Sequence, residues 1–361
     1  MLVDYFIDKP IKTEKDMVGV ARFLAETEHR IKKWGFDYNY IYPPQYNSWA
    51  AVQFSRYFLF PFFSKKHPHA KIAHLGHHTL GFLLNMPFMK KYRKTVITCY
   101  DLVNFQPEYR GSKIKNLVYD FSANSMRKAD AVIAVTESIK DELIKKAGVD
   151  CKKIHVINLS VDLRKFKPKK VPPSFYKKYR LPENKRIVLY VGTEEPRKNM
   201  PTLVEALSKV KSDFVFVKAG RPHWKDGREK LAALIKKYGL EGKTKIIDFI
   251  EEGDLASMYN AAAAFIFPCK YPTYGLPPIE AMACGTPTII ASDEFTSAEL
   301  RRAAVCCHPL DSNAFAAGID KVLSDRKFSG RLSANGRKYA SRYTWDRAAA
   351  GIAKVYKKLT Q

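Results

Sequence analysis

Two cations, Arg197 and Lys198, follow a glycine in the segment Tyr190–Ala206, which reads YVGTEEPRKNMPTLVEA. An apolar run ends at Gly192, and a helix is expected to begin near Pro201, because proline suits the first helical position. A glycine after a strand lets the backbone approach a bound group, and two cations beside it suit a diphosphate. The segment alone also fits a second interpretation, a solvated basic pair at the start of a helix.

A second segment, Phe267–Ile289, reads FPCKYPTYGLPPIEAMACGTPTI. It predicts a strand, a loop and a helix that begins at about Pro277 and ends at Gly285, because prolines and glycines mark both ends. The backbone amides of Gly275 and Leu276, with the positive end of the helix dipole behind them, can hold phosphate oxygens. This segment therefore predicts a second place where phosphate can bind.

Glu280 lies in the first turns of that helix. Its carboxylate could accept hydrogen bonds from the two neighbouring hydroxyls of a ribose. An acid near a helix N-terminus also complements the helix dipole without binding any ligand. The residue by itself does not decide between these two roles.

In their order and spacing, these segments resemble the family 4 retaining glycosyltransferases, the glycosyl transferases group 1. The resemblance is also carried by YTWDRAA near the C-terminus, and by KADAVIAVTESIKDEL and VDLRKFKP in the first half. It extends from about Thr95 to the C-terminus. It implies the GT-B fold, in which two doubly wound, Rossmann-like α/β domains face each other across a cleft.

The resemblance implies a nucleotide-diphosphate sugar, GDP- or UDP-linked, as the donor substrate, with neither a cofactor nor a metal. Arg197 and Lys198 match the cations on the donor diphosphate, and Glu280 matches the acid that binds the ribose. Gly192 and Thr193 match the adjacent glycine loop. The loop beneath the donor sugar and its phosphates corresponds to Thr273, Tyr274, Gly275 and Leu276.

Two positions depart from the family pattern. Pro272 stands where the first glutamate of a pair is expected, eight positions before Glu280, and proline has no side-chain acceptor. Tyr100 stands where many relatives carry a histidine just before an aspartate, here Asp101, and tyrosine does not titrate near neutral pH. Tyr100 and Asp101 join the two cations of the first segment as the expected catalytic set.

The activity that the resemblance implies belongs to glycan biosynthesis. It is the transfer of a hexose, of mannose or glucose type, to a glycan or lipid-linked acceptor, with retention of configuration and without a metal. The two departures keep an alternative open, a catalytically impaired nucleotide-sugar-binding partner subunit of another transferase. Binding of the donor without turnover would distinguish the second function from the first.

The elements that position these residues alternate between short apolar strands and helices, which predicts parallel sheets covered on both faces. One helix is expected from Glu137 to Ala147, with Thr136 as its N-cap and Gly148 just past its end. The expected strands are Lys71–His74, Thr95–Cys99, Ala131–Val135, Ile154–Ile157, Arg186–Val191, Phe214–Val217, Lys245–Phe249, Ala264–Phe267 and Thr288–Ala291.

A change of composition divides the chain at Phe166–Ser174, where prolines and lysines predict a linker. We expect an acceptor-binding domain over residues 1–167 and a nucleotide-sugar-binding domain over residues 168–343. Residues 344–361 are expected to form a helix that crosses back to the first domain. Ligands bind at the carboxyl ends of the strands in such sheets, so the chemistry is expected in the cleft between the domains.

The formal net charge of +26 favours anionic partners, without choosing between nucleic acid, acidic lipid and phosphorylated substrates. No motif supports nucleic acid. The stretch Tyr38–Tyr100 has no Asp or Glu and mixes aromatic with basic residues, which suits the interface of an anionic membrane, although a domain core needs such rings as well. Within it, His77 and His78 either contact a phosphorylated acceptor or are ordinary core or loop histidines.

The six cysteines are scattered and include no C-x-x-C pair, which is typical of reduced intracellular proteins. The N-terminus, MLVDYFIDKP, lacks the order of a signal peptide, and no apolar run is long enough to span a bilayer. We therefore expect a cytoplasmic protein, with peripheral contact at the inner face of the membrane.

Overall fold

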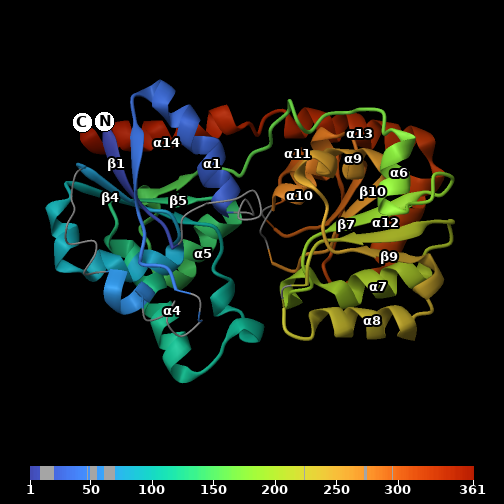
Figure 1. Cartoon of the computed structure of the whole chain (residues 1–361), viewed down its shortest axis with the longest axis horizontal. Coiled ribbons are helices and arrows are strands. Elements are labelled where there is room, and N and C mark those ends of the chain that lie inside the picture. Colours follow the sequence, from blue (N-terminus) through green and yellow to red (C-terminus); the bar gives the residue numbers. More distant parts are fainter. Residues whose placement is uncertain are drawn as a thin grey trace. The chain divides into compact units, whose positions relative to one another are not determined.

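The computed structural model of the chain describes residues 1–8, 20–46, 48, 55–60, 70–222, 224–271, 275–294 and 296–361. They form two compact units, here called unit 1 (Met1–Leu159 and Trp345–Gln361) and unit 2 (Ser160–Thr344). Each unit holds a six-stranded sheet of parallel strands with helices on both faces (Figure 1). The prediction of two doubly wound α/β domains is confirmed.

In unit 1 the strands pair in the order β2-β1-β3-β4-β5-β6, so the strand order reverses between β1 and β3. Ligands of such sheets bind at the carboxyl ends of the strands beside this reversal. The strands are β1 (Leu2–Phe6), β2 (Asp37–Ile41), β3 (Ile72–Leu75), β4 (Lys94–Cys99), β5 (Ala131–Ala134) and β6 (Ile154–Val156).

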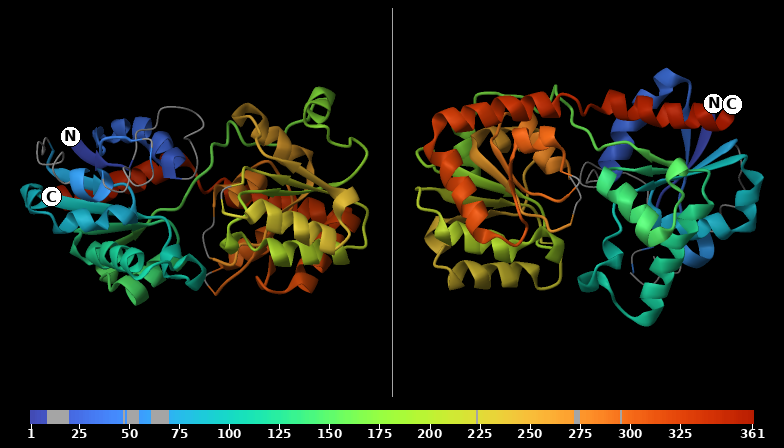
Figure 2. Two further views of the ribbon diagram at one scale, coloured as in Figure 1. Left: turned by 60° about the horizontal axis from the view of Figure 1, so that its bottom comes forward. Right: turned by 180° about the vertical axis from the view of Figure 1, so that it is seen from behind.

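Helices cover both faces of this sheet (Figure 2). Two pack together on one face, α1 (Val20–Ile31) and α14 (Trp345–Thr360), while α4 (Lys113–Ser125) and α5 (Glu137–Ala147) lie on the other. The helix predicted over Glu137–Ala147 is confirmed. Thr136 accepts a hydrogen bond from the Ile139 amide at 3.1 Å, and Gly148 ends the helix in the left-handed conformation.

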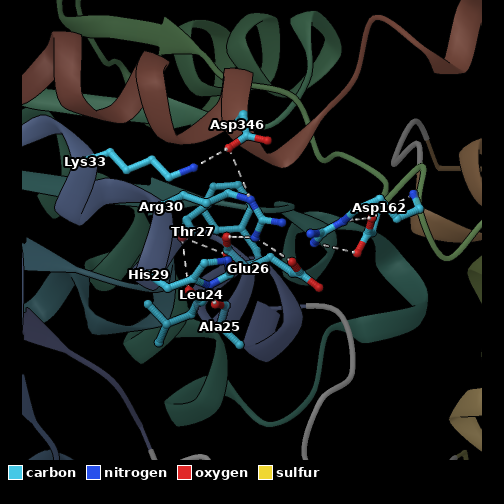
Figure 3. A network of polar contacts seen from close by, with 11 residues as sticks. Leu24, Ala25, Glu26, Thr27, His29, Arg30, Lys33, Asp162 and Asp346 are labelled. Carbon is cyan, nitrogen blue, oxygen red and sulfur yellow. Dashed lines mark hydrogen bonds and ion pairs between the residues drawn. The ribbon is translucent and has the colours of Figure 1, made fainter.

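The C-terminal helix α14 belongs to unit 1, where it packs against α1. Phe23 of α1 meets Trp345 edge to face, with ring centroids 5.9 Å apart. Arg30 lies 3.6 Å from the Asp346 carboxylate and also pairs with Glu26 at 2.7 Å (Figure 3). These contacts attach the last helix of the chain to unit 1, although it follows unit 2 in the sequence.

In unit 2 the strands pair in the order β12-β11-β10-β7-β8-β9, with the reversal between β7 and β10. The strands are β7 (Ile187–Val191), β8 (Val215–Ala219), β9 (Thr244–Ile247), β10 (Ala262–Phe267), β11 (Thr288–Ala291) and β12 (Val305–Cys307). Since β10, β7 and β8 are neighbours and parallel, the loops after them meet at one edge of the sheet.

Helices also cover both faces of the unit 2 sheet. Helices α7, α8 and α12 lie on one face, and α9, α10, α11 and α13 on the other. The helices are α6 (Pro173–Tyr179), α7 (Met200–Lys209), α8 (Gly227–Lys237), α9 (Glu252–Ala261), α10 (Leu276–Ala283), α11 (Ala298–Ala303), α12 (Ser312–Ser324) and α13 (Arg326–Ala340). Within the described residues, no helix is both long and apolar enough to cross a membrane.

Candidate functional site

Two glycines bring the loops after β7 and β8 into close contact. Gly192 has a φ of 156° and Gly220 a φ of 130°, backbone conformations that favour glycine. The Gly192 amide donates to the carbonyl of Ala219 at 2.9 Å. A Cβ atom on Gly220 would lie only 2.5 Å from the Gly192 carbonyl oxygen, so no larger residue fits without a shift of the backbone. Glycine at these two positions therefore allows the loops after β7 and β8 to pack closely at the carboxyl edge of the sheet.

Asn199 anchors the loop that follows Gly192. It is buried in the left-handed conformation, with a φ of 57°. Its side-chain amide donates to the carbonyls of Pro268 at 3.1 Å and of Pro309 at 2.6 Å. The Lys270 amide donates to the carbonyl of Arg197 at 2.8 Å. The loops after β7 and β10 are thus joined beside the two predicted phosphate cations.

Arg197 and Lys198 are both partly exposed at this edge. The Nε atom of Arg197 donates to Glu195 at 2.7 Å, and Thr193 donates to the other oxygen of the same carboxylate at 2.9 Å. Burial alone would raise the pKa of Glu195, but the charge and hydrogen bond of Arg197 and the nearby charge of Lys198 hold it below its ordinary value. The Lys198 ammonium lies 4.9 Å from the centre of the Phe267 ring. The structure thus brings Gly192, Thr193, Arg197 and Lys198 together.

Glu280 lies in the second turn of α10 and is only 3% exposed. Its Oε2 atom accepts a hydrogen bond from the buried hydroxyl of Tyr259 at 2.9 Å. Gly275 is the N-cap residue of α10, and Leu276 is its first residue, so both lie at the positive end of the helix dipole. Pro272, Thr273 and Tyr274 lie outside the described residues, so the predictions for Thr273 and Tyr274 stay predictions.

A buried charge network in unit 2 was missed by the sequence analysis. Lys218 of β8 is 0% exposed and forms an ion pair with Glu194. The carboxylate of Glu194 also accepts a hydrogen bond from the Nε atom of Arg228 at 2.9 Å. Arg228 reaches Asp248 at 2.6 Å as well. Burial lowers the pKa of Lys218 even though Glu194 opposes the shift. The signal was a single lysine in the apolar run FVFVKA, which has to be paired if that strand is buried.

The Oε2 atom of Glu194 is buried and has no hydrogen-bond partner among the described residues. An unpaired carboxylate oxygen in the interior is costly, because it loses water without gaining a donor. This atom lies in the loop between Gly192 and the two cations, so the described part of the candidate site holds a buried acceptor without a described donor.

In unit 1, the predicted residues gather at the carboxyl ends of β3 and β4. The rings of His77 and Tyr100 stack with centroids 5.8 Å apart, and those of His77 and His78 lie 4.2 Å apart. His77 contacts the Thr79 hydroxyl at 2.8 Å, and Asp101 receives the amide of Val103 at 3.3 Å. Tyr100, Asp101, His77 and His78 therefore form one cluster within unit 1.

Several polar atoms in this cluster are buried without a hydrogen-bond partner among the described residues. They are both ring nitrogens of His78 and the hydroxyl of Tyr100. Burial lowers the pKa of His78 to about 3 and that of His77 to about 4, so both rings are neutral at physiological pH. The neutral ring of His78, which lacks partners among the described residues, can exchange hydrogen bonds with the hydroxyl groups of a ligand.

An ion pair beside this cluster was also missed. Arg56 donates through Nε to the Asp8 carboxylate at 2.7 Å and through Nη2 to the Thr79 hydroxyl at 3.1 Å. The acid and the arginine are 48 residues apart in the chain. Neither residue stands in a motif that would have singled it out.

Just over half of the described rings of the acid-free stretch Tyr38–Tyr100 lie in the core of unit 1, whereas Tyr42, Tyr46 and Phe58 are exposed. The buried ones are Tyr38, Phe60, Phe82, Phe88, Tyr92 and Tyr100. Residues 47, 49–54 and 61–69 of the stretch lie outside the described residues. The described part therefore favours the core interpretation of these rings. Within the described residues, no three His, Cys, Asp or Glu side chains are grouped as a metal would need.

Comparison with known protein families gives two matches along the chain. The family described as Glycosyl transferases group 1 matches residues 173–339, and Glycosyltransferase Family 4 matches residues 18–165. The chain is 26% identical over 267 residues to the serotype-specific mannosyltransferase WbdA of Escherichia coli, covering 71% of this chain and 32% of that protein. This chain thus corresponds to less than half of the length of that relative.

Solved structures with the same arrangement of elements cover almost the whole chain. Sucrose-phosphate synthase from Thermosynechococcus elongatus superposes with a TM-score of 0.82 at 20% identity, over 99% of both chains. HepE from Anabaena, in complex with UDP and glucose, superposes with a TM-score of 0.78 at 18% identity, over 99% of this chain and 100% of that one. At such identities the likeness shows the fold alone.

Proposed function

This chain belongs to the glycosyl transferases group 1 and has their GT-B fold, and from that premise we propose that it moves a hexose from a nucleotide-diphosphate sugar to an acceptor. The observation that carries the proposal is the carboxyl edge of unit 2, where Arg197 and Lys198 are partly exposed on a loop that Asn199 holds in place. Two cations at the carboxyl edge of a doubly wound sheet suit a diphosphate.

The donor nucleotide is proposed to bind across the loops after β7, β8 and β10. Arg197 and Lys198 would neutralise the diphosphate, with the amides of Gly275 and Leu276 at the start of α10. Glu280 would accept hydrogen bonds from the ribose hydroxyls. The hydrogen bond that Tyr259 donates to Glu280 supports this role, because it fixes the carboxylate in one position.

A mannose- or glucose-type sugar, on GDP or UDP, is proposed as the donor. WbdA is named a mannosyltransferase, and HepE was solved with UDP and glucose, which supports the two sugar types and uridine as a base. Pro272 stands where the family has the first glutamate of its pair. Backbone groups and Thr273 would therefore hold the donor sugar instead of that glutamate.

The proposed reaction retains the configuration at the anomeric carbon. The bond from that carbon to the donor phosphate breaks, and the acceptor oxygen bonds to the carbon on the same face. The leaving diphosphate oxygen takes the proton of the acceptor hydroxyl, so no protein base and no metal are needed. Arg197, Lys198 and the N-terminus of α10 would stabilise the charge that develops on the leaving group.

The acceptor, a glycan or a lipid-linked glycan, is proposed to bind in unit 1. Its hydroxyl groups would form hydrogen bonds with the neutral rings of His77 and His78 and with the hydroxyl of Tyr100. Asp101 lies beside these residues. The cytoplasm, at the inner face of the membrane, is the proposed site of the reaction. Six cysteines without a disulfide among them support a reducing compartment.

Thermal melting against GDP-mannose, UDP-glucose and ADP-glucose tests the proposed donor site. A ligand at about a hundred times its Kd should add roughly 2.7 kcal/mol to the stability of unit 2, which raises Tm by several degrees. We expect the shift with the guanosine or uridine donor, and a much smaller one in Lys198→Ala. An equal shift in that variant would exclude the proposed diphosphate site, and no shift with any donor would exclude donor binding.

A further inference from the structure

Helix α4 of unit 1 exposes a stripe of large apolar side chains. Ile114 is 77% exposed, Leu117 is 70% exposed and Phe121 is 49% exposed. They follow one another at intervals of three and four residues, so they lie on one face of the helix. The helix lies at the margin of unit 1 (Figure 1).

The opposite face of α4 is packed too tightly for the helix to turn its apolar stripe inward. The Ser122 hydroxyl donates to the carbonyl of Thr79 at 3.1 Å, and Ala123 is buried. A Cβ atom on Gly81 would lie 2.1 Å from the Ser122 carbonyl oxygen, so glycine is needed for this approach. Small residues therefore fix the buried face, and the large apolar ones are left outside.

Single exposed apolar side chains are ordinary, but a contiguous set on one helix marks a surface for interaction. The surroundings of this set are basic. Lys113 and Lys115 are exposed in the first turn, and Arg127 and Lys128 are exposed just past the end. The acid in the helix, Asp120, pairs with Arg110 at 2.9 Å. The surface thus combines apolar side chains with a positive charge.

We propose that this α4 surface (Ile114, Leu117 and Phe121 with Lys113 and Lys115) docks on a membrane that contains anionic lipid. Apolar side chains enter the boundary between headgroups and acyl chains, while lysines extend to lipid phosphates. A second copy of the chain fits less well, because three side chains on one 13-residue helix fall short of the roughly 800 Å² per partner of a stable interface.

This inference deepens the proposed function, which places the reaction at the inner face of the membrane, but it does not depend on the donor site in unit 2. It also differs from the expectation drawn from composition. The acid-free stretch Tyr38–Tyr100 places just over half of its described rings in the core, whereas α4 lies outside that stretch and exposes its apolar residues. An anionic surface is complementary to a chain with a net charge of +26.

Vesicle sedimentation with the full chain tests the proposal. The probes are vesicles of phosphatidylcholine alone and of phosphatidylcholine with phosphatidylglycerol. We expect the protein to bind the second kind, and to bind it less as salt rises. The variant Ile114→Gln, Leu117→Gln, Phe121→Gln replaces the stripe with residues that favour helices, and we expect its vesicle affinity to fall roughly a hundredfold.

A control variant, Ile144→Gln with Leu310→Gln, removes two exposed apolar side chains that lie on other elements. It should bind vesicles like the unchanged protein. Thermal melting checks that both variants fold, and the nucleotide-induced shift reports on unit 2 separately. Vesicle binding that survives the α4 substitutions would overturn the proposal, as would an unchanged protein that ignores anionic vesicles. A dimer that the α4 substitutions dissociate, without vesicle binding, would assign the surface to a second copy.

Discussion

Replacing both Arg197 and Lys198 by alanine is expected to lower kcat/KM of sugar transfer roughly a thousandfold. Loss of one group that stabilises a developing negative charge typically costs a hundred- to a thousandfold, and here two are removed. The loop itself should persist, because Asn199 holds it through the carbonyls of Pro268 and Pro309. Initial rates at varied donor concentration measure the effect.

The matched control is a second basic pair in unit 2. Lys236 and Lys237 are exposed in the last turn of α8, which ends at the amino edge of the sheet, opposite to the candidate site. Their replacement by alanine should leave kcat/KM within about twofold, as exposed charges away from a site contribute little. Full activity of the Arg197→Ala, Lys198→Ala double variant would remove the proposed role of the two cations.

Acid is expected to destabilise unit 1 through its buried histidines. His74 is fully buried between the hydroxyls of Tyr356 and Thr98, and burial lowers its pKa to about 3. A depressed pKa means that the unfolded chain binds the proton first. The stability from the neutral ring is complete above about pH 6.5 and is lost as the pH falls below it, at about 1.4 kcal/mol per pH unit.

His77 and His78 also make unit 1 less stable in acid, because burial lowers their pKa values to about 4 and about 3. The three rings together make the stability of unit 1 fall by several kcal/mol between about pH 6.5 and about pH 5. Urea unfolding at a series of pH values, followed by hydrogen exchange in β3 and β4, measures this slope.

The variant His74→Gln should be less stable near pH 8 but show a shallower loss in acid, since one titrating ring is gone. The exposed His29 of α1 is the matched control, and His29→Gln should keep the slope of the unchanged protein. An identical slope in His74→Gln would contradict the account of the buried histidine.

Features that depend on neighbours in sequence could be predicted. The ends of α5 follow from Thr136 and Gly148, since a cap bonds to amides within a few residues of itself. The strand β5 follows from its unbroken apolar run, because both faces of a parallel sheet are covered. The glycine loop and the two cations of unit 2 were likewise recognisable from one short segment.

Features that depend on pairing across the fold could not be predicted. Lys218 meets Glu194 only because β7 and β8 lie side by side in a particular register. Tyr259 meets Glu280 through the packing of α9 on α10. The apolar spacing of Ile114 and Leu117 would by itself place them inside, yet Ser122 and Ala123 occupy the buried face of α4.

Proton NMR of the reaction product tests the central claim most directly. GDP-mannose and UDP-glucose serve as donors, and octyl glycosides of mannose, glucose, galactose and N-acetylglucosamine serve as acceptors. The account predicts a glycoside whose new bond has the anomeric configuration of the donor sugar, formed by the unchanged chain and lost in the Arg197→Ala, Lys198→Ala variant. An inverted product would contradict retention. Tight donor binding without any transfer would contradict the enzyme and favour a partner subunit of another transferase.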